Sequence, residues 1–417
     1  MTEQIAQKFQ HLQLDARVLK QLAKRDIQRP TQIQSSAIPL ILQGKDVIAG
    51  SDTGSGKTLA FVLPLIQCLI NRQQTATDTN SSITHLILVP TRELAQQVLK
   101  VLQDFADVFE PELSVSASLV VGGRSYAEQA EQLTTGAQFL IATPGRLLDL
   151  LKNRGLSLAS VQTLVLDEAD RMLDMGFKDE LNAIIRTLPK ERQTLLFSAT
   201  LDEAVFRFSN ASQSSPRLIE LKSRNATKAD ITQKVYLVDE EKKQALLRHL
   251  IGKSNWSQAL IFVRNKQDAD RLVEALAQEQ ASVAALHGDK SQAQREKTIA
   301  AFQAGELKLL IATDLAARGL DIEALPVVIN YQLPHNPEDY VHRVGRTGRA
   351  GMAGLALSLV TSQDEALLNK IEKATDERLL QQWYPGFEPD LNRITPEPAK
   401  TSLRKGGKGR GRKRGRF

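Results

Sequence analysis

Short apolar runs rich in valine, isoleucine and leucine alternate along the chain with longer segments in which apolar residues recur at helical spacing. In the first half, these runs cover residues 47–48, 86–89, 119–121, 139–141, 164–166 and 195–197. In the second half, they cover residues 259–263, 283–286, 309–311, 327–329 and 355–359. Such runs are typical of parallel strands that are buried on both faces. The pattern therefore predicts an α/β protein in which each half forms a parallel sheet covered by helices.

Several of the predicted strands end directly in a small polar cluster. These clusters lie at residues 90–93, 122–123, 143–146, 167–170, 198–200, 287–289 and 313–314. Ligands of open α/β sheets bind beyond the carboxyl ends of the strands. We therefore expect the chemistry of both halves to lie at these strand ends.

The boundary between the halves follows from a change in composition. Residues 216–221 have the pattern of a closing edge strand, and residues 222–230 are polar and mixed in charge. We expect a first domain at 1–221, a linker at 222–230, a second domain at 231–380 and a C-terminal extension at 381–417.

Local patterns also predict smaller features. Residues 71–82 have the composition of a polar loop, and residues 364–380 have a helical pattern. The aromatic residues in the segment 383–387 are expected to pack on the second domain, with contact to bases as the alternative.

The size and composition fit a protein with two domains. The chain has 417 residues, of which 42% are hydrophobic and 24% are charged, and this length exceeds what one compact core usually holds. No apolar run reaches the roughly 20 residues of a membrane helix, and residues 1–10 lack the apolar segment of a secretion signal. Cys68 is the only cysteine, so we expect it in the core of a cytoplasmic protein.

The net charge of +6 is unevenly distributed. Residues 400–417 contain nine lysines and arginines and no acidic residue, so subtracting nine from +6 leaves −3 for the rest of the chain. Glycines interleave these charges, and the segment lacks the apolar residues of a core, so we expect a disordered basic tail. Such a tail binds polyanions, most obviously nucleic acid. A solubilising terminus without a dedicated partner is the alternative.

A phosphate-binding loop is predicted between a strand and a helix near the start of the chain. Its glycines let backbone amides approach phosphates, and the next helix directs the positive end of its dipole at them. Lys57 is expected to pair with the β- and γ-phosphates of a nucleotide, and Thr58 to bind Mg²⁺. The loop differs from the general pattern in having Ser51 where a glycine is usual. It comprises Ser51, Asp52, Thr53, Gly54, Ser55, Gly56, Lys57 and Thr58.

An acidic cluster, Asp167-Glu168-Ala169-Asp170, follows the predicted strand at 164–166. Phosphoryl transfer needs one carboxylate to hold Mg²⁺ and another to orient or deprotonate the attacking water. A short acidic cluster alone is more often a solvated turn. Together with Lys57, however, it indicates an ATP site.

These motifs, taken in order, resemble the motif set of the DEAD-box RNA helicases. The set consists of Gln34, residues 51–58, 90–95, 143–146, 167–170, 198–200, 317–321 and 342–349. The resemblance runs from Phe9 to Arg349. It implies two RecA-like domains that close around ATP, Mg²⁺ and single-stranded RNA, in a protein expected to be monomeric.

The resemblance assigns roles in catalysis. It implies that Asp167 holds Mg²⁺, that Glu168 is the catalytic base, and that Arg346 and Arg349 reach across the cleft as arginine fingers. Asp321 is expected to contact the ribose. A network that couples hydrolysis to strand release is expected from Asp170, Ser198, Ala199, Thr200 and His342.

Adenine recognition is expected from Gln34, because an amide can donate to and accept from the adenine edge at once. Phe9 occupies the place of the upstream aromatic residue of the family. Asp26 and Ile27 stand where the family usually has a glycine and an aromatic residue. Ile27 can pack on adenine but has no π-face to stack on it.

Family positions that line the RNA channel are also present. They are Arg92, Gly122, Gly123, Thr143, Arg146, His287, Gly288, Asp289, Gln292, Arg295 and Thr313. Many are residue types that contact phosphate and sugar, so we expect RNA binding without sequence preference. For His287 and Gln292, a place in the core or at a helix cap is the alternative.

We therefore interpret the chain as an ATP-dependent RNA helicase that unwinds short duplexes locally. A translocating DNA helicase is one alternative, which Gln34 and Asp170 (in place of the histidine of the DEAH group) argue against. An ATP-gated RNA clamp is the other, and the same motifs serve both it and a helicase.

Overall fold

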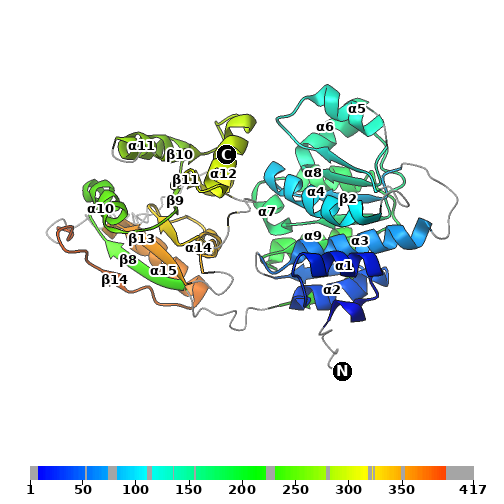
Figure 1. Ribbon diagram of the computed structural model, residues 1–417, viewed down its shortest axis with the longest axis horizontal. Helices are drawn as coiled ribbons and strands as arrows, with labels where there is room; N and C mark the ends of the chain where they lie inside the picture. Colours follow the sequence, from blue (N-terminus) through cyan, green and yellow to red (C-terminus); the bar gives the residue numbers. More distant parts are fainter. Residues whose placement is uncertain are drawn as a thin grey trace, which may run out of the picture.

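The computed structural model describes residues 8–51, 54–73, 82–109, 115–134, 136–154, 156–221, 231–278, 282–317, 322, 325–348 and 353–390. These residues form two lobes, each built on a seven-stranded sheet, that lie side by side (Figure 1). Every strand pairing that the described residues make is parallel. The predicted fold class, with two helix-covered parallel sheets, is confirmed.

The two sheets have the same strand order. In the first lobe it is β3-β4-β2-β5-β6-β1-β7, and in the second β10-β11-β9-β12-β13-β8-β14. The first sheet comprises β1 (Val47–Gly50), β2 (His85–Leu88), β3 (Ala117–Val120), β4 (Phe139–Ala142), β5 (Thr163–Leu166), β6 (Gln193–Ser198) and β7 (Arg217–Glu220). The second comprises β8 (Ile231–Leu237), β9 (Ala259–Val263), β10 (Val283–Leu286), β11 (Leu309–Thr313), β12 (Val327–Asn330), β13 (Gly354–Val360) and β14 (Gln381–Gln382).

Helices surround both sheets (Figure 1). Those of the first lobe are η1 (Phe9–Leu12), α1 (Ala16–Lys24), α2 (Gln32–Leu42), α3 (Lys57–Gln73), α4 (Arg92–Ala106), η2 (Asp107–Phe109), α5 (Tyr126–Thr134), α6 (Pro144–Arg154), α7 (Ala169–Asp174), α8 (Lys178–Ile185) and α9 (Glu203–Ser212). Those of the second are α10 (Glu240–Lys253), α11 (Lys266–Ala277), α12 (Gln292–Gln303), α13 (Asp314–Ala317), α14 (Pro337–Val344), η4 (Ser362–Asp364) and α15 (Glu365–Thr375).

The central strands are buried on both faces, which explains their unbroken apolar runs. Along β4, Phe139 and Ile141 join one hydrophobic cluster and Leu140 and Ala142 join the other, because successive side chains point to opposite faces. Fully burying a side chain of this kind contributes roughly 1.5–3 kcal/mol. Each sheet is therefore the centre of a two-sided core, and its carboxyl edge is left for polar residues.

Side-chain caps start the helices at those carboxyl edges. Thr91 accepts a hydrogen bond from the amide of Leu94 at the start of α4, and Ser291 and Gln294 form a capping box at the start of α12. Such caps stabilise a helix by about 1 kcal/mol. The caps fix the point where the backbone leaves each sheet and enters a helix. They thereby fix the positions of the side chains in the first helical turn.

The structure corrects three expectations near helix ends. Helix α3 continues through residue 73, so the predicted polar loop begins later than residue 71, and its residues 74–81 lie outside the described ones. The predicted helix at 364–380 ends at Thr375, because Asp376 adopts a left-handed conformation with φ of 51°. Strand β14 was not predicted, and its pairing with β8 carries the second sheet past residue 380.

The aromatic residues after β14 mainly pack, as expected. Tyr384 and Phe387 contact His249, and Tyr384 also contacts Tyr236, whereas Trp383 is 54% exposed. Cys68 is partly buried rather than fully enclosed, and burial raises the pKa of its thiol. Within the described part of the chain, no helix has the length and apolarity required to cross a bilayer. The predicted linker at 222–230 and basic tail at 400–417 lie outside the described residues.

Candidate active site

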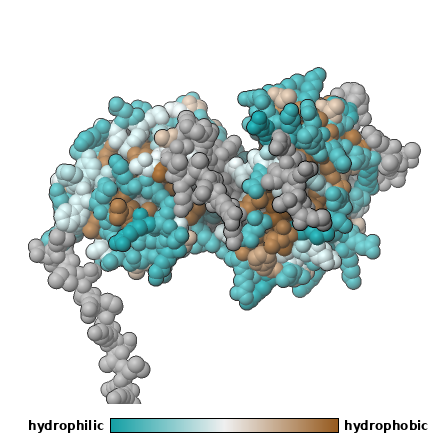
Figure 2. Space-filling model, turned by 90° about the horizontal axis from the view of Figure 1, so that it is seen from below, coloured by the Kyte–Doolittle hydropathy of each residue, from teal (hydrophilic) through white to brown (hydrophobic). Residues whose placement is uncertain are grey.

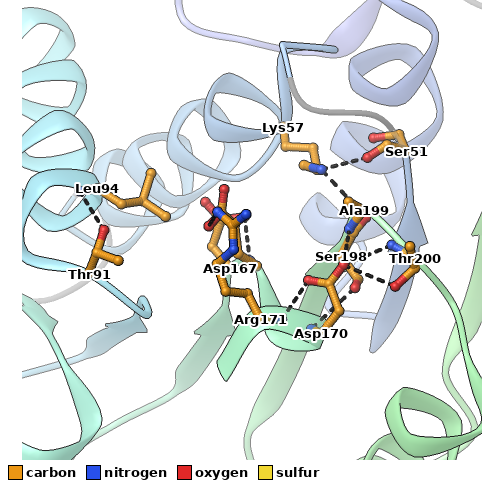
Figure 3. Close-up of polar contacts among 11 residues, drawn as sticks. Ser51, Lys57, Thr91, Leu94, Asp167, Asp170, Arg171, Ser198, Ala199 and Thr200 are labelled. Atoms are coloured by element: carbon orange, nitrogen blue, oxygen red, sulfur yellow. Dashed lines mark hydrogen bonds and ion pairs between the residues drawn. The ribbon is translucent and has the colours of Figure 1, made fainter. Parts of the chain in front are cut away.

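The phosphate loop connects β1 to α3, and its lysine is held near two backbone carbonyls. Lys57 is 7% exposed, and its ammonium donates to the carbonyl of Ser51 at 2.5 Å and to that of Ser198 at 3.5 Å (Figure 3). Both partners are neutral carbonyls, and among the described residues no carboxylate forms a direct ion pair with Lys57, although its charge acts on Asp167 and Asp170. A buried ammonium at a helix N-terminus is suited to a phosphate group. Asp52 and Thr53 lie outside the described residues.

Gln34 ties α2 to the phosphate loop. Its amide nitrogen donates to the carbonyl of Gly56 at 3.1 Å, and its amide oxygen accepts from the amide of Thr31 at 2.9 Å. Gly56 has a φ of 91°, and a Cβ atom there would lie 2.4 Å from the Gln34 amide nitrogen. An amide has two donors and two lone pairs, so one of each remains for a base.

The other adenine candidates lie in different surroundings. Phe9 is 4% exposed and belongs to the hydrophobic core of the first lobe, so its ring supports this region from within instead of offering a face to a base. Ile27 packs partly buried against the same core. Asp26, which precedes it, adopts a φ of 57°, a conformation that glycine reaches with less strain.

The acidic cluster follows β5, and its first carboxylate is almost fully buried. Asp167 is 3% exposed, and burial together with the neighbouring Glu168 raises its pKa to about 7. Lys57 acts in the opposite direction but does not cancel the effect. The carboxylate of Asp167 is therefore placed where a further positive charge would stabilise it.

The donor set at Asp167 fits Mg²⁺. Among the described residues, no group of three or more histidine, cysteine, aspartate or glutamate side chains could enclose a metal ion. Magnesium is usually held by one or two carboxylates, with phosphate oxygens and waters completing its shell. One carboxylate, Asp167, and one hydroxyl, Thr58, suit that chemistry.

Glu168 has a strained backbone and a fixed side chain. Its φ of 53° lies in the left-handed region, which costs a residue with a side chain of this size about 1–3 kcal/mol and is common at functional sites. Its carboxylate accepts from Arg171 at 2.9 Å, and both side chains are largely buried. Arg171 was not singled out from the sequence, and its i,i+3 spacing from Glu168 on a short helix is the signal that could have found it.

Asp170 joins the end of β5 to the end of β6. One of its oxygens accepts from the amides of Ala199 at 3.0 Å and Thr200 at 2.9 Å, and also from the Thr200 hydroxyl at 3.1 Å (Figure 3). Its own amide donates to the Ser198 hydroxyl at 3.3 Å. Burial would raise the pKa of Asp170, but the hydrogen bonds from Thr200 and Arg171 outweigh it and lower the pKa. The structure thus brings Lys57, Asp170 and residues 198–200 together at the carboxyl edge of the first sheet.

Helix α14 of the second lobe faces this region from the other side of the interface (Figure 1). Burial and the charge of Arg171 lower the pKa of His342 to about 4, despite the opposing effects of Asp170 and Glu168. Among the described residues, the buried Nδ1 of His342 has no hydrogen-bond partner. Arg346, just beyond α14, is 8% exposed. Arg349 and Asp321 lie outside the described residues.

A third arginine of the same segment has a structural role that the sequence did not reveal. Arg343 is 1% exposed and forms a two-pronged ion pair with Asp314 at 2.6 and 2.7 Å. It also donates to Asn330 and to the carbonyl of Gln332. These bonds hold α14 against the strand ends of its own lobe, so Arg343 cannot extend toward the first lobe.

The candidate RNA residues of the first lobe form a compact group around Arg92. Its guanidinium lies against Gly122 and Gly123, where a Cβ atom would come within 3.2 and 2.0 Å of it. Arg146 donates to the carbonyl of Arg124 and lies 5.8 Å from the ring centre of Tyr126. Burial, Arg295 and Arg146 lower the pKa of Arg92. Such close grouping of positive charges favours a polyanion.

Three polar pairs join α4 of the first lobe to α12 of the second, and we call them the α4–α12 contact. Arg295 pairs with Glu93 at 2.7 Å, Gln96 donates to Glu296 at 3.0 Å, and Arg92 donates to Gln292 at 3.3 Å. The sequence placed Glu93 in the motif at 90–95 but gave it no role at the interface, and Gln96 and Glu296 were not singled out. Their helical spacing shows that each set shares a face, but nothing local shows that the two faces meet.

The remaining candidates of the second lobe lie at the ends of β10 and β11. His287 is 2% exposed, and its Nε2 lies 3.0 Å from Asp270, so its side chain supports the loop from inside. Asp289 pairs with Lys266 at 2.7 Å, and Thr313 closes β11. The space around Gly288 is open. In the first lobe, Thr143 takes the corresponding place at the end of β4.

Comparison with known proteins decides the family. Family models match residues 31–208 as a DEAD/DEAH box helicase and residues 241–351 as a helicase conserved C-terminal domain. The RNA helicase CrhR of Synechocystis is 42% identical over 383 residues, which cover 92% of this chain and 75% of that protein. The chain belongs to the DEAD-box family of ATP-dependent RNA helicases. The helicase DeaD of Buchnera aphidicola is also 42% identical, but this chain spans only 61% of its length.

Solved structures of the family indicate how the lobes are arranged. A structure of S. cerevisiae Dbp5 bound to RNA and ADP BeF3 has a TM-score of 0.77 at 32% identity, with 90% of this chain and 96% of that chain covered. Mss116p bound to ssRNA and AMP-PNP has a TM-score of 0.82 at 28% identity, with 92% and 80% covered. A DEAD box protein from Methanococcus jannaschii, 34% identical with 90% and 99% covered, reaches only 0.51. The arrangement of the whole chain is thus more similar to these Dbp5 and Mss116p structures than to that of the M. jannaschii protein.

Proposed function

We propose that this chain closes its two lobes on ATP and single-stranded RNA, and that this closure separates short RNA duplexes locally. One observation carries the proposal. Helix α14 of the second lobe lies so close to the acidic cluster of the first that His342 is influenced by Arg171, Asp170 and Glu168. Residues on both sides of the interface can therefore act on one nucleotide.

In this proposal, Lys57 and the amides of the phosphate loop bind the phosphates, and Asp167 and Thr58 hold Mg²⁺. When bound, Mg²⁺ neutralises charge on the phosphate oxygens. Glu168, held by Arg171 at 2.9 Å, orients the attacking water and accepts its proton. Asp321 contacts the ribose, and Gln34 uses its remaining donor and acceptor on adenine.

The second lobe supplies the charge that completes the site. Arg346 and Arg349 approach the γ-phosphate as arginine fingers, a device that contributes roughly 10³–10⁵ in rate. The network of Asp170, Ser198 and Thr200, together with His342, links hydrolysis to separation of the lobes. Neither lobe alone is then expected to hydrolyse ATP at the full rate.

RNA binding in this proposal depends on the sugar–phosphate backbone. Arg92 and Arg146, with the amides of Gly122 and Gly123, suit phosphate, and none of the proposed contacts reads a base edge. Arg295 and Thr313 complete the path on the second lobe. We propose binding without sequence preference by a monomer.

Assays with RNA and DNA of matched sequence test this function against its rivals. The expected result is an ATPase stimulated by RNA and local unwinding of short RNA duplexes. ATP-dependent RNA retention with no strand separation would instead indicate a clamp. Strong DNA stimulation with processive unwinding would overturn the proposal.

The basic tail provides a separate prediction. Removing residues 400–417 deletes nine positive charges and should weaken RNA binding. The slope of log affinity against log salt concentration should fall by at most about 6 if all nine charges contact single-stranded RNA. Fluorescence anisotropy at several salt concentrations measures that slope. An unchanged slope would show that the tail does not bind the RNA.

A further inference from the structure

The α4–α12 contact contains a chain of hydrogen bonds that runs through one carboxylate, that of Glu296. Helix α12 lies on the side of the second lobe that faces the first (Figure 1). Oε1 of Glu296 accepts from the amide nitrogen of Gln292 at 2.9 Å, within α12, and from that of Gln96 at 3.0 Å, across the interface. The amide oxygen of Gln292 in turn accepts from Arg92 at 3.3 Å. Glu296 is therefore connected to Arg92 through a single side chain.

The two neighbours of Gln292 decide which way its amide points. A carboxylate only accepts hydrogen bonds, and a guanidinium only donates them. The amide of Gln292 must therefore turn its nitrogen to Glu296 and its oxygen to Arg92. Without an acceptor at position 296, the amide would be able to turn its nitrogen to the guanidinium, and two donors would then face each other.

The backbone of the first lobe also confines Arg92. Its Nη1, the atom that donates to Gln292, would lie only 2.0 Å from a Cβ atom at Gly123. Its Nη2 would lie 3.2 Å from a Cβ atom at Gly122. A guanidinium that contacts two glycines and an oriented amide has little room to rotate. The side chain proposed to contact the RNA backbone is thus held in place from both lobes.

These bonds differ in what they require. The bond from Gln292 to Glu296 joins residues four apart on α12, so it can form in the second lobe alone. The bonds from Gln96 and Arg92 cross the interface and require the lobes to be together. The amide of Gln292 is therefore oriented before the lobes meet, and closure adds the other two bonds. The hydrogen bonds from Gln292 and Gln96 also lower the pKa of Glu296, which keeps its carboxylate charged as an acceptor.

We propose that Glu296 is a positioning residue for RNA binding. Through Gln292 it orients Arg92 toward the RNA backbone in the closed arrangement, and through Gln96 it contributes one bond to closure itself. This inference rests on the proposed function, in which the lobes close on ATP and RNA and Arg92 contacts phosphate. Since Glu296 acts across the interface, its loss should weaken only the RNA affinity that depends on nucleotide.

A purely electrostatic effect of this carboxylate would have the opposite sign. Glu296 is exposed, and the charges of Arg124 and Arg295 act on it. A negative charge beside a path for RNA repels phosphate, so its removal alone would strengthen RNA binding with or without nucleotide. The proposed positioning role predicts weaker binding instead, and only in the closed arrangement.

The test compares two variants that remove the same charge. Glu296→Met cannot accept a hydrogen bond, whereas the new amide oxygen in Glu296→Gln can still accept from both neighbouring amides. The affinity of the full chain for a fluorescently labelled single-stranded RNA is measured with Mg²⁺ and ADP·BeF3, and again without nucleotide. With ADP·BeF3, Glu296→Met should weaken RNA binding about fivefold, and Glu296→Gln by less than about twofold, as expected for the loss of one net hydrogen bond. Without nucleotide, neither variant should bind RNA more weakly than the unaltered protein.

Further measurements separate positioning from a general loss of structure. Glu274→Met makes the same change at an exposed position of α11 in the second lobe and should leave both affinities unchanged. In RNA-stimulated hydrolysis, Glu296→Met should raise KM for RNA and leave kcat at saturating RNA unchanged, because the ATP site is intact. In a protein that already carries Arg92→Met, the same change should cause little further loss, since the path through Gln292 is already broken. Thermal unfolding checks that each variant is folded.

The outcomes distinguish the inference from the function on which it rests. If ADP·BeF3 does not tighten RNA binding by the unaltered protein, the proposed function fails. If it does, but folded Glu296→Met binds RNA as tightly as Glu274→Met or more tightly, the role of Glu296 fails alone. Equal losses in Glu296→Met and Glu296→Gln would show that the charge matters and the orientation of Gln292 does not, which would also overturn the inference.

Discussion

Each lobe contains a buried lysine after the strand next to the sheet edge, and the two lysines have different surroundings. Lys57, after β1, contacts the neutral carbonyls of Ser51 and Ser198. Lys243, after β8, is 2% exposed and pairs with Glu240 at 3.2 Å and Asp364 at 3.5 Å. The first lysine keeps a charge that can bind phosphate, whereas the charge of the second is cancelled within the protein.

The strand ends beside these lysines differ in the same way. After β5 the first lobe has Asp167 and Glu168, whereas after β12 the second lobe has Tyr331 and Gln332. Gln332 accepts from the amide of Arg264 at 2.7 Å and donates to Asp268 at 2.9 Å. The same strand order thus supports the candidate active site in one lobe and a structural polar network in the other. Seen from below, both lobes have a mostly hydrophilic surface (Figure 2).

The largest expected effect comes from replacing Glu168 with glutamine, which is the residue that the second lobe has at the equivalent position, Gln332. Glu168→Gln should leave ATP and RNA bound but lower RNA-stimulated turnover by about 10²–10⁴, the usual contribution of a general base. Steady-state hydrolysis and a nucleotide-binding titration measure the two properties. Normal turnover in a folded variant would show that Glu168 is not the catalytic base.

Exchanging each lysine for methionine tests the contrast between them. Lys57→Met should reduce hydrolysis by about 10²–10³, the cost of losing one preorganised charge at a transition state, with little loss of stability. Lys243→Met should instead destabilise the second lobe by about 3 kcal/mol, because it leaves Asp364 and Glu240 short of a partner. Arg264 lies 2.7 Å from Asp364 and would still pair with it. We therefore expect a destabilisation at the low end of the roughly 3–5 kcal/mol that breaking a buried ion pair costs.

Tryptophan fluorescence during urea unfolding reports on the second lobe, since Trp256 and Trp383 are the two tryptophans of the chain. Circular dichroism follows both lobes. The contrast between the lysines would be contradicted if Lys57→Met lowered the fluorescence midpoint and Lys243→Met did not.

The smallest expected effect concerns His85, the first residue of β2. The equivalent strand of the second sheet, β9, begins with the apolar residue Ala259. Burial and the charge of Arg72 lower the pKa of His85 to about 3. The pKa of His85 in the folded protein thus lies below the unfolded value of 6.5. The contribution of its neutral imidazole to the free energy of unfolding is therefore fully present above pH 6.5 and is lost as the pH falls toward 3. Between pH 7 and pH 5 the loss is about 2 kcal/mol.

Urea unfolding of the protein and of His85→Leu at both pH values measures this effect. The stability of the unaltered protein relative to the variant should fall by that amount at pH 5. An equal response of the two proteins to pH would show that His85 is protonated in the folded state.

Much of this protein was determined by the sequence alone. Both sheets follow from strands buried on two faces, because such strands must be apolar at every position. The phosphate loop and the cluster at Asp167 are also local, since their residues are adjacent in the chain. The early end of the last helix and strand β14 escaped prediction because Gln381 and Gln382 are polar and pair only through their backbones with β8.

Only the tertiary structure decided which of several similar charged residues is paired within its own lobe and which lies in the candidate active site. Arg343 and Arg346 lie three positions apart, yet Arg343 is committed to Asp314 within its own lobe. Lys57 and Lys243 follow equivalent strands, but the direct partners of Lys57 are neutral carbonyls and those of Lys243 are carboxylates. The attraction of Arg295 to Glu93 arises between groups far apart in the chain. The strength of such a pair depends on the distance, burial and partners of each charge, and folding alone sets those quantities.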